Sequence, residues 1–236
     1  KAFLNRVLAG RIPGPGRVNL TPMLLESGKL NGDLTVACID EETFYLFGSS
    51  VAQNMHLRWF EMHLEGVQDV VYQNMTDDFH GIAISGPNSR ELLSRLTRED
   101  VSSETFKFRD IRDTFIGGVP ALCTRISFTG ELGYEIYVAP QYQLKLFEAI
   151  EELGVDLNLK WFGGRALMSM RLEKSWGAWT MDFRPDFTIM ESGLDFFVDW
   201  DKDFIGKKAA LIEKNNGPSK KLSVIQIDTE TDVSGD

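Results

Sequence analysis

The sequence predicts an α+β fold in which helices cover antiparallel sheets, arranged as two ferredoxin-like layers. Strand-like apolar runs follow one another through short turns, without the strict strand–helix alternation of a doubly wound sheet. Asn31-Gly32 separates two such runs, and Asn-Gly is a strong hairpin signal because both residues tolerate positive φ. A second turn, at residues 129–133, separates another pair of runs.

The first part of the chain predicts two helices around three strands. Apolar spacing favours a helix over residues 2–9, which Gly10 and the Pro-Gly cluster at 13–16 end. Strands are expected at residues 18–25, 34–39 and 44–47. A helix is expected over residues 51–64, because Val51, Met55, Trp59 and Met62 form one apolar stripe.

The middle of the chain predicts strands that flank a capped helix. Residues 87–96 form this helix, with Asn88 as N-cap and Glu91 as its capping-box partner. Strands are expected at residues 67–72, 81–85, 114–116, 119–126 and 133–139.

Two further helices and two late strands complete the expected elements. Apolar spacing predicts a helix over 142–153. The apolar residues between 167 and 172 predict a buried helix over 164–175. Strands are expected at 196–198 and 222–227.

The composition of the chain excludes several classes of protein and partner. The 236 residues, 43% apolar and 25% charged, describe an ordinary globular protein. A net charge of −10 argues against nucleic acid as a partner, and no apolar run is long enough to predict a membrane span. Cys38 and Cys123 lie in apolar runs and are expected as small core residues. Two cysteines give no disulfide framework, which favours a reducing compartment. We expect the cytoplasm, with the mitochondrial matrix as the alternative. The chain opens without Met and is expected to be a piece of a longer protein.

Several common active-site patterns are absent from the sequence. There is no phosphate-binding Gly-x-x-x-x-Gly-Lys loop, no dinucleotide-binding Gly-x-Gly-x-x-Gly and no Gly-x-Ser-x-Gly nucleophile turn. The three histidines do not have zinc-ligand spacing, and there is no Cys-x-x-Cys pair. No metal site is therefore expected.

Two carboxylates remain as candidates for chemistry. Glu135 lies just inside the strand at 133–139, where it is either a solvent-facing hairpin residue or an acceptor of two parallel N–H bonds from a flat ligand. Asp33 follows Asn31-Gly32 and is either a turn residue or a functional carboxylate. The residues alone leave both alternatives open.

Five motifs in a fixed order resemble the folate-binding aminomethyltransferase family, which includes the T-protein of the glycine cleavage system. The segment with Arg171-Leu172-Glu173-Lys174 is most similar to the C-terminal halves of sarcosine and dimethylglycine dehydrogenases. The resemblance covers nearly the whole chain. The motifs lie at residues 31–36, 84–89, 126–135, 171–174 and 204–207.

The resemblance implies a role for five residues. Asp33, in Gly-Asp-Leu-Thr-Val, matches the family's catalytic carboxylate, which stabilises positive charge during one-carbon transfer. Glu135, in Thr-Gly-Glu-Leu-Gly-Tyr-Glu, matches its pterin-binding carboxylate. Phe128 stands at a stacking aromatic position, without the family's hydroxyl. Trp176 matches an aromatic suited to the p-aminobenzoyl ring. Arg165 is the nearest replacement for an arginine that the T-proteins carry and this chain lacks.

The implied function is tetrahydrofolate-dependent one-carbon transfer. It would form 5,10-methylenetetrahydrofolate in the catabolism of sarcosine or dimethylglycine, with a small amine-derived one-carbon donor. A glycine cleavage aminomethyltransferase is the alternative, although residues 166–168 lack that group's Ala-Arg-Asp. A non-catalytic folate-binding homologue is the third possibility. FAD is expected only if a separate N-terminal domain or a flavin subunit exists.

The resemblance also implies a domain division. Residues 1–215 would form the folate-binding region, as two ferredoxin-like subdomains. Residues 216–236 would begin a C-terminal β-barrel.

Overall fold

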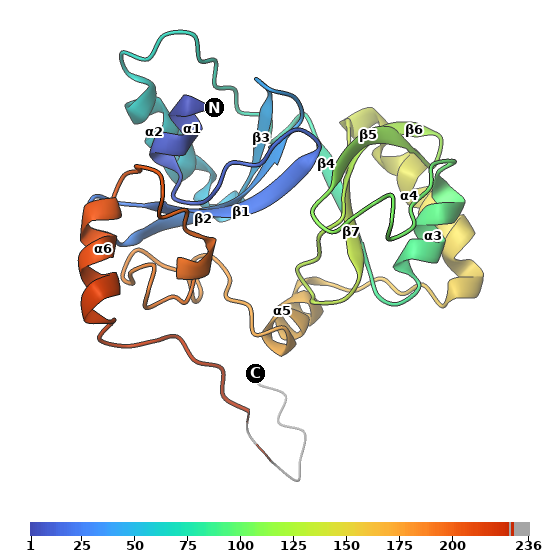
Figure 1. The fold of residues 1–236 in the computed structure, drawn as a ribbon. Helices are drawn as coiled ribbons and strands as arrows, with labels where there is room; N and C mark the ends of the chain where they lie inside the picture. Colours follow the sequence, from blue (N-terminus) through green and yellow to red (C-terminus); the bar gives the residue numbers. More distant parts are fainter. Residues whose placement is uncertain (227, 229–236) are drawn as a thin grey trace.

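The computed structural model describes residues 1–226 and 228 of the chain. Within these residues two antiparallel sheets lie side by side, each with its own helices (Figure 1). One sheet has three strands in the order β1-β2-β3, and the other has four in the order β4-β7-β6-β5. The predicted α+β class with antiparallel sheets is confirmed. No helix among the described residues combines the length and the apolar character that crossing a bilayer requires.

The first sheet packs beneath the two N-terminal helices. Its elements are α1 (Ala2–Val7), β1 (Arg17–Leu24), β2 (Leu30–Cys38), β3 (Phe44–Phe47) and α2 (Gln53–Leu64). Phe60, Trp59, Met23 and Val36 belong to the core cluster between the helices and the sheet. Because their apolar spacing is regular, these elements lie within a few residues of the predicted ranges, with one exception in β2.

The exception is the first hairpin turn. The turn uses Gly28, whose φ is +81°, and the backbone N–H of Leu25 donates to the carbonyl of Lys29. Asn31 and Gly32 therefore lie inside β2 rather than between two strands. The predicted Asn-Gly hairpin is wrong, and Asp33 is a strand residue.

The last part of the chain returns to cover the first sheet. It contains α6 (Lys207–Asn216) and packs Trp179, Phe183 and Ile189 into a core with Leu30. The expected strand at 196–198 is instead a 3-10 turn, Asp195–Phe197, followed by one bridge between Val198 and Gly10. The other 3-10 turns are Ser50–Ala52, Pro140–Tyr142 and Val155–Leu157.

The second sheet is built from one continuous stretch of chain. Its elements are β4 (His80–Ser85), α3 (Ser89–Leu96), β5 (Ile111–Ile116), β6 (Val119–Thr124), β7 (Gly133–Val138) and α4 (Gln143–Gly154). Both helices cover the same face, where Tyr134, Ile136, Leu146 and Ile150 are fully buried. The alternating pattern of β7 therefore turns Glu135 and Tyr137 to the opposite face.

The two sheets touch along that opposite face. Val18 and Ala37 of the first sheet pack with Ile111 and Leu122 of the second. The rings of Phe47 and Tyr137 stack with centroids 4.4 Å apart.

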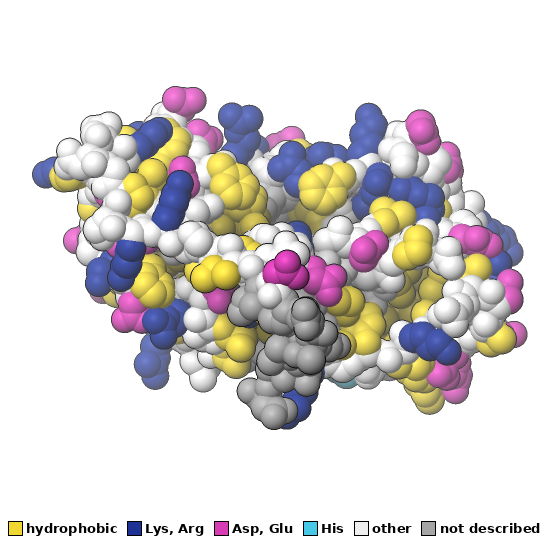
Figure 2. Space-filling model, turned by 90° about the horizontal axis from the view of Figure 1, so that it is seen from below, with side chains coloured by type: hydrophobic (Ala, Val, Ile, Leu, Met, Phe, Trp, Pro, Cys, Tyr) yellow, Lys and Arg dark blue, Asp and Glu magenta, His cyan; other side chains and the backbone are white. Residues whose placement is uncertain are grey.

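Seen from below, Lys and Arg side chains are scattered over both halves of the molecule, with acidic and apolar side chains between them (Figure 2).

Helix α5 (Gly164–Glu173) lies between the two halves (Figure 1). The sequence predicts it as a buried helix, but Arg171 is its one buried residue. Leu167, Met168 and Met170 are half-buried or line a cavity, and Leu172 is exposed. The apolar character of α5 therefore comes in part from a cavity wall and not from a core.

Three smaller predictions are also wrong. Residues 67–72 form no strand, because Asp69 has a φ of +63° and Val71 is exposed. Asn88 makes no side-chain cap, since its Nδ2 donates to the carbonyl of Leu157 at 3.2 Å, and Glu91 pairs with Arg95 instead. Residues 222–226 form no strand, and residue 227 lies outside the described residues.

Candidate functional site

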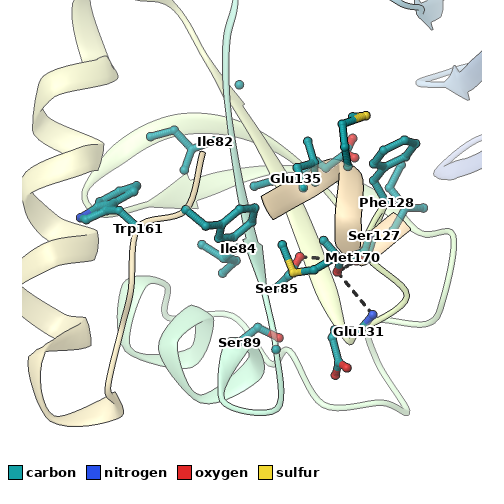
Figure 3. Close-up of a pocket in the computed structure, with 18 of the residues that line it drawn as sticks. Ile82, Ile84, Ser85, Ser89, Ser127, Phe128, Glu131, Glu135, Trp161 and Met170 are labelled. Atoms are coloured by element: carbon teal, nitrogen blue, oxygen red, sulfur yellow. Dashed lines mark hydrogen bonds between the residues drawn. The ribbon is translucent and has the colours of Figure 1, made fainter. Parts of the chain in front are cut away.

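A cavity of about 1190 Å³ opens between the two sheets. This volume is somewhat larger than is usual for small-molecule sites. Glu135, Phe128 and Met170 gather near α5, while Ile82 and Trp161 lie at the other end, beside α4 (Figure 3). Further lining side chains come from β2, β3 and the returning segment: Asp33, Thr35, Phe47, Trp179 and Met181.

Asp33 reaches this cavity from the middle of β2, where it pairs with Pro22 of β1. Among the described residues its Oδ1 atom is buried and has no hydrogen-bond partner. Burial raises the pKa of Asp33 to about 6, against a smaller opposing effect of its own backbone N–H. A buried carboxylate oxygen without a protein partner is suited to a donor or a positive charge on a ligand.

Gly32 allows β2 to place Asp33 in this position. Its φ is +146°, and a Cβ there would lie 2.6 Å from Nε2 of His56. A Cβ at Gly48 would come within 3.0 Å of Nδ1 of the same ring. His56 is buried, and burial lowers the pKa of its imidazole, which keeps it neutral. The two glycines thus pack β2 and the end of β3 against a neutral ring.

Glu135 enters the cavity from β7, on the second sheet. The hydroxyl of Tyr137 donates to its Oε2 at 2.5 Å. Burial raises the pKa of Glu135, while the Tyr137 hydrogen bond and the charge of Lys174 act in the other direction. On the neighbouring strand β4, the residues opposite Glu135 and Tyr137 are Ala83 and Gly81. These small residues leave the carboxylate uncovered on that side.

The turn before β7 supplies an aromatic ring and a group of hydroxyls. Phe128 lines the cavity close to Glu135 and Met170 (Figure 3). The hydroxyls of Ser127 and Thr129 lie 2.9 Å apart, and Ser85 is 3.4 Å from Ser127. This part of the cavity therefore combines an apolar surface with groups that can donate or accept hydrogen bonds.

The structure brings three of the five predicted site residues together: Asp33, Glu135 and Phe128. Trp176 is not part of the cavity lining and packs edge-on against Phe183 and Phe197, with ring centroids 5.8 Å away in each case. Arg165 is exposed on the first turn of α5, also outside the lining. Their contacts with a ligand stay predictions.

Two residues beside Glu135, Tyr137 and Lys174, are not among the predicted site residues. Tyr137 had a signal, since it lies two positions after Glu135 in a strand and must share its face. Lys174 stands in the Arg171-Leu172-Glu173-Lys174 motif, but no local pattern predicts its place beside Glu135, because its contact with the turn joins segments that are far apart in the chain. Its Nζ donates to the carbonyl of Ser127 at 2.8 Å and lies 5.2 Å from the Trp176 ring centroid. Across residues 1–226 and 228, no cluster of three or more potential metal ligands occurs.

Comparison with known proteins identifies the family. The model of the GCVT N-terminal domain matches residues 1–202. Human mitochondrial dimethylglycine dehydrogenase is 34% identical over 231 residues, which are 97% of this chain and 27% of that protein. An aminomethyltransferase of Thermoanaerobacter sp. (strain X514) is 34% identical over 208 residues, covering 87% of this chain and 56% of that protein. The chain thus spans only part of these relatives.

A solved structure agrees in fold. The crystal structure of glycine cleavage system aminomethyltransferase T from Bartonella henselae superposes with a TM-score of 0.78 at 23% identity. The match covers 92% of this chain and 59% of that one. The resemblance inferred from the motifs is confirmed, and this chain belongs to the GCVT N-terminal domain family.

Proposed function

We propose that the cavity between the sheets binds tetrahydrofolate and that this chain carries tetrahydrofolate-dependent one-carbon transfer. The main support for the proposal is that two partly desolvated carboxylates, Asp33 and Glu135, line the same cavity from different sheets. Buried carboxylates are costly unless a ligand or a partner offsets their desolvation. Membership of the GCVT N-terminal domain family supports a reduced folate as the class of ligand.

The cavity residues fit a reduced folate. A pterin presents an amino group and a ring N–H side by side, and one carboxylate can accept both. Glu135 would take this role, because Tyr137 occupies only one lone pair of its Oε2 atom. Phe128 offers a ring face for stacking beside it. The unpartnered Oδ1 of Asp33 would face the reacting end of the ligand.

Asp33 would act on charge and protons. Tetrahydrofolate, when bound, supplies the nitrogens that take up the one-carbon unit. With a pKa of about 6, Asp33 is mostly ionised at neutral pH and can stabilise positive charge that develops beside it. The same pKa lets it accept a proton and return it near pH 7.

We propose the catabolism of an N-methyl amine, sarcosine or dimethylglycine, as the context of this transfer, with 5,10-methylenetetrahydrofolate as product. The Arg171-Leu172-Glu173-Lys174 element and the similarity to dimethylglycine dehydrogenases support it. The second candidate is glycine cleavage, which the equal identity to an aminomethyltransferase favours. A non-catalytic folate-binding homologue is the third. Flavin absorbance of the full-length protein would favour the first candidate, and transfer from a lipoyl-bound aminomethyl group would favour the second.

Two further expectations belong to this proposal. We propose residues 1–215 as the folate-binding region in two subdomains, with 216–236 starting a β-barrel. The described residues reach only part of that second segment. For the compartment, we keep the cytoplasm, with the mitochondrial matrix as the alternative that the human relative's name supports.

Calorimetric titration with tetrahydrofolate tests the folate site. Glu135→Gln replaces a charged acceptor by an amide that presents a donor, and should weaken binding by about 2–4 kcal/mol, or roughly 30- to 1,000-fold in Kd. Glu148→Gln, an exposed residue of α4 outside the cavity, is the matched control and should bind normally. Unchanged affinity in a folded Glu135→Gln variant would exclude the pterin-binding role.

A further inference from the structure

We infer that Tyr137 is a positioning residue that holds the Glu135 carboxylate in its binding orientation. It thereby sets the affinity of the folate site and the pH below which binding weakens. The inference rests on the proposed function, because it assigns Tyr137 a role at that same site. It adds a residue that neither the motif nor the cavity lining contains.

The position of Tyr137 is fixed by both sheets. Its hydroxyl donates to Oε2 of Glu135 at 2.5 Å. Its ring stacks on Phe47 of β3, with centroids 4.4 Å apart and planes 24° apart. On the β4 side the ring faces Gly81, where an added Cβ would lie 3.3 Å away. The phenol therefore sits between the sheets, and its hydroxyl has little freedom to leave Glu135.

A fixed carboxylate binds more tightly than a free one. A glutamate side chain has several rotatable bonds, and ordering it during binding weakens affinity. Tyr137 orders it beforehand, through one hydrogen bond to one oxygen. Both lone pairs of Oε1 and one of Oε2 stay available, which is enough for a bidentate ligand.

The charged and titratable groups around Glu135 give the inference a second readout. Lys174 approaches from the end of α5, Cys123 lies on the neighbouring strand β6, and Asp33 lines the same cavity from the first sheet. Burial raises the pKa of both Tyr137 and Cys123, so these two groups stay protonated and neutral. After burial itself, the Tyr137 hydrogen bond is the larger influence on the pKa of Glu135 and lowers it, and Lys174 acts in the same direction.

Removal of the hydroxyl should therefore move the pH profile in a defined direction. Without the Tyr137 hydrogen bond, the pKa of Glu135 rises further above its usual range. Protonated Glu135 cannot accept the two pterin N–H groups, so affinity falls on acidification. In Tyr137→Phe this fall should begin at a higher pH than in the unmodified protein. The ligand's own titration is common to both and cancels in the comparison.

The experiment is calorimetric titration with tetrahydrofolate between about pH 5.5 and pH 8. Tyr137→Phe keeps the ring and its stack, and should raise Kd about tenfold near neutral pH. Tyr45→Phe is the matched control, because Tyr45 packs on Phe47 in the same aromatic cluster but makes no hydrogen bond to Glu135. It should leave both affinity and pH profile unchanged.

A double-variant cycle with Glu135→Gln separates positioning from a general structural effect. If Tyr137 acts through Glu135, Tyr137→Phe should have little further effect once Glu135 is replaced by glutamine. An equal loss in both backgrounds, or an unchanged Kd and pH profile in Tyr137→Phe, would overturn the inference. Failure of the folded, unmodified protein to bind tetrahydrofolate would instead refute the proposed function itself.

Discussion

Asp33→Asn should stabilise the ligand-free protein, and the gain should depend on pH. Burial raises the pKa of Asp33 from 3.8 to about 6 in the folded state. The folded state therefore holds the proton more tightly than the unfolded chain does. The protonated form of Asp33 adds to the free energy of unfolding. This addition is complete below about pH 4 and is lost as pH rises through about 6. An amide side chain at this position never carries the charge, so the free energy of unfolding of the variant does not fall in this way as pH rises.

The magnitude follows from the size of the pKa change. A rise from 3.8 to about 6 is about two units, and each unit corresponds to about 1.36 kcal/mol. Because Asp33 keeps some exposure, solvent screening reduces the sum, and we expect about 2–3 kcal/mol above pH 7. For a chain of this size, that gain corresponds to about 5–10 °C in Tm.

Thermal melting of both proteins at a series of pH values between about 4 and 8 measures this effect. The two Tm values should be close at the acid end, diverge as pH rises from about 4 to about 6, and keep a constant difference above that. Asp113→Asn, an exposed aspartate of strand β5, is the control and should show no such divergence. A Tm difference between Asp33→Asn and the unmodified protein that is the same at every pH would refute the reasoning.

Three further changes have defined outcomes. Asp33→Ala should leave the fold intact and reduce formation of 5,10-methylenetetrahydrofolate about 100-fold; normal turnover with a lowered Tm would leave Asp33 a structural residue. Gly32→Ala should lower the free energy of unfolding by about 2–4 kcal/mol, since its Cβ would lie 2.6 Å from Nε2 of His56, whereas Gly14→Ala meets no atom within 4 Å and should be neutral. Arg171→Met should cost about 3–5 kcal/mol in urea unfolding, because it leaves Asp182 without its 2.5 Å ion pair; a change below about 1 kcal/mol would contradict this.

The sequence was most informative where one periodic pattern decides the structure. Residues 44–47 form the predicted strand without any shift, and the helix predicted at 142–153 is found at Gln143–Gly154. The first hairpin was misplaced because Gly32 serves a packing contact with His56 instead of a turn. Local preference cannot distinguish these two uses of glycine, since both accept a positive φ.

The candidate site also has features that the sequence predicts and features that depend on tertiary packing. Asp33, Glu135 and Phe128 could be selected from the sequence because each lies in a motif. Their common cavity depends on two sheets that meet face to face, which no local pattern encodes. The apolar residues of α5 show the converse case, since a cavity wall and a core require the same composition.

The route of the chain through its two sheets has a consequence for folding. The four-stranded sheet and its helices use only residues 80–154, a single uninterrupted stretch. The three-stranded sheet needs both early and late residues, because the backbone N–H of Leu30 in β2 donates to the carbonyl of Phe187. Helix α1 beside the sheet also contacts the late segment: Lys202 Nζ donates to the carbonyl of Asn5 at 2.6 Å, across 197 positions in sequence.

On a ribosome, residues 80–154 can therefore complete their core before the late segment that packs on the N-terminal strands has been synthesised. Contacts of such long sequence separation are slow to form, because the intervening chain must be ordered first. The N-terminal sheet would thus be the last part to become protected from hydrogen exchange during refolding, and the cavity that it shares with Glu135 would close only at that final step.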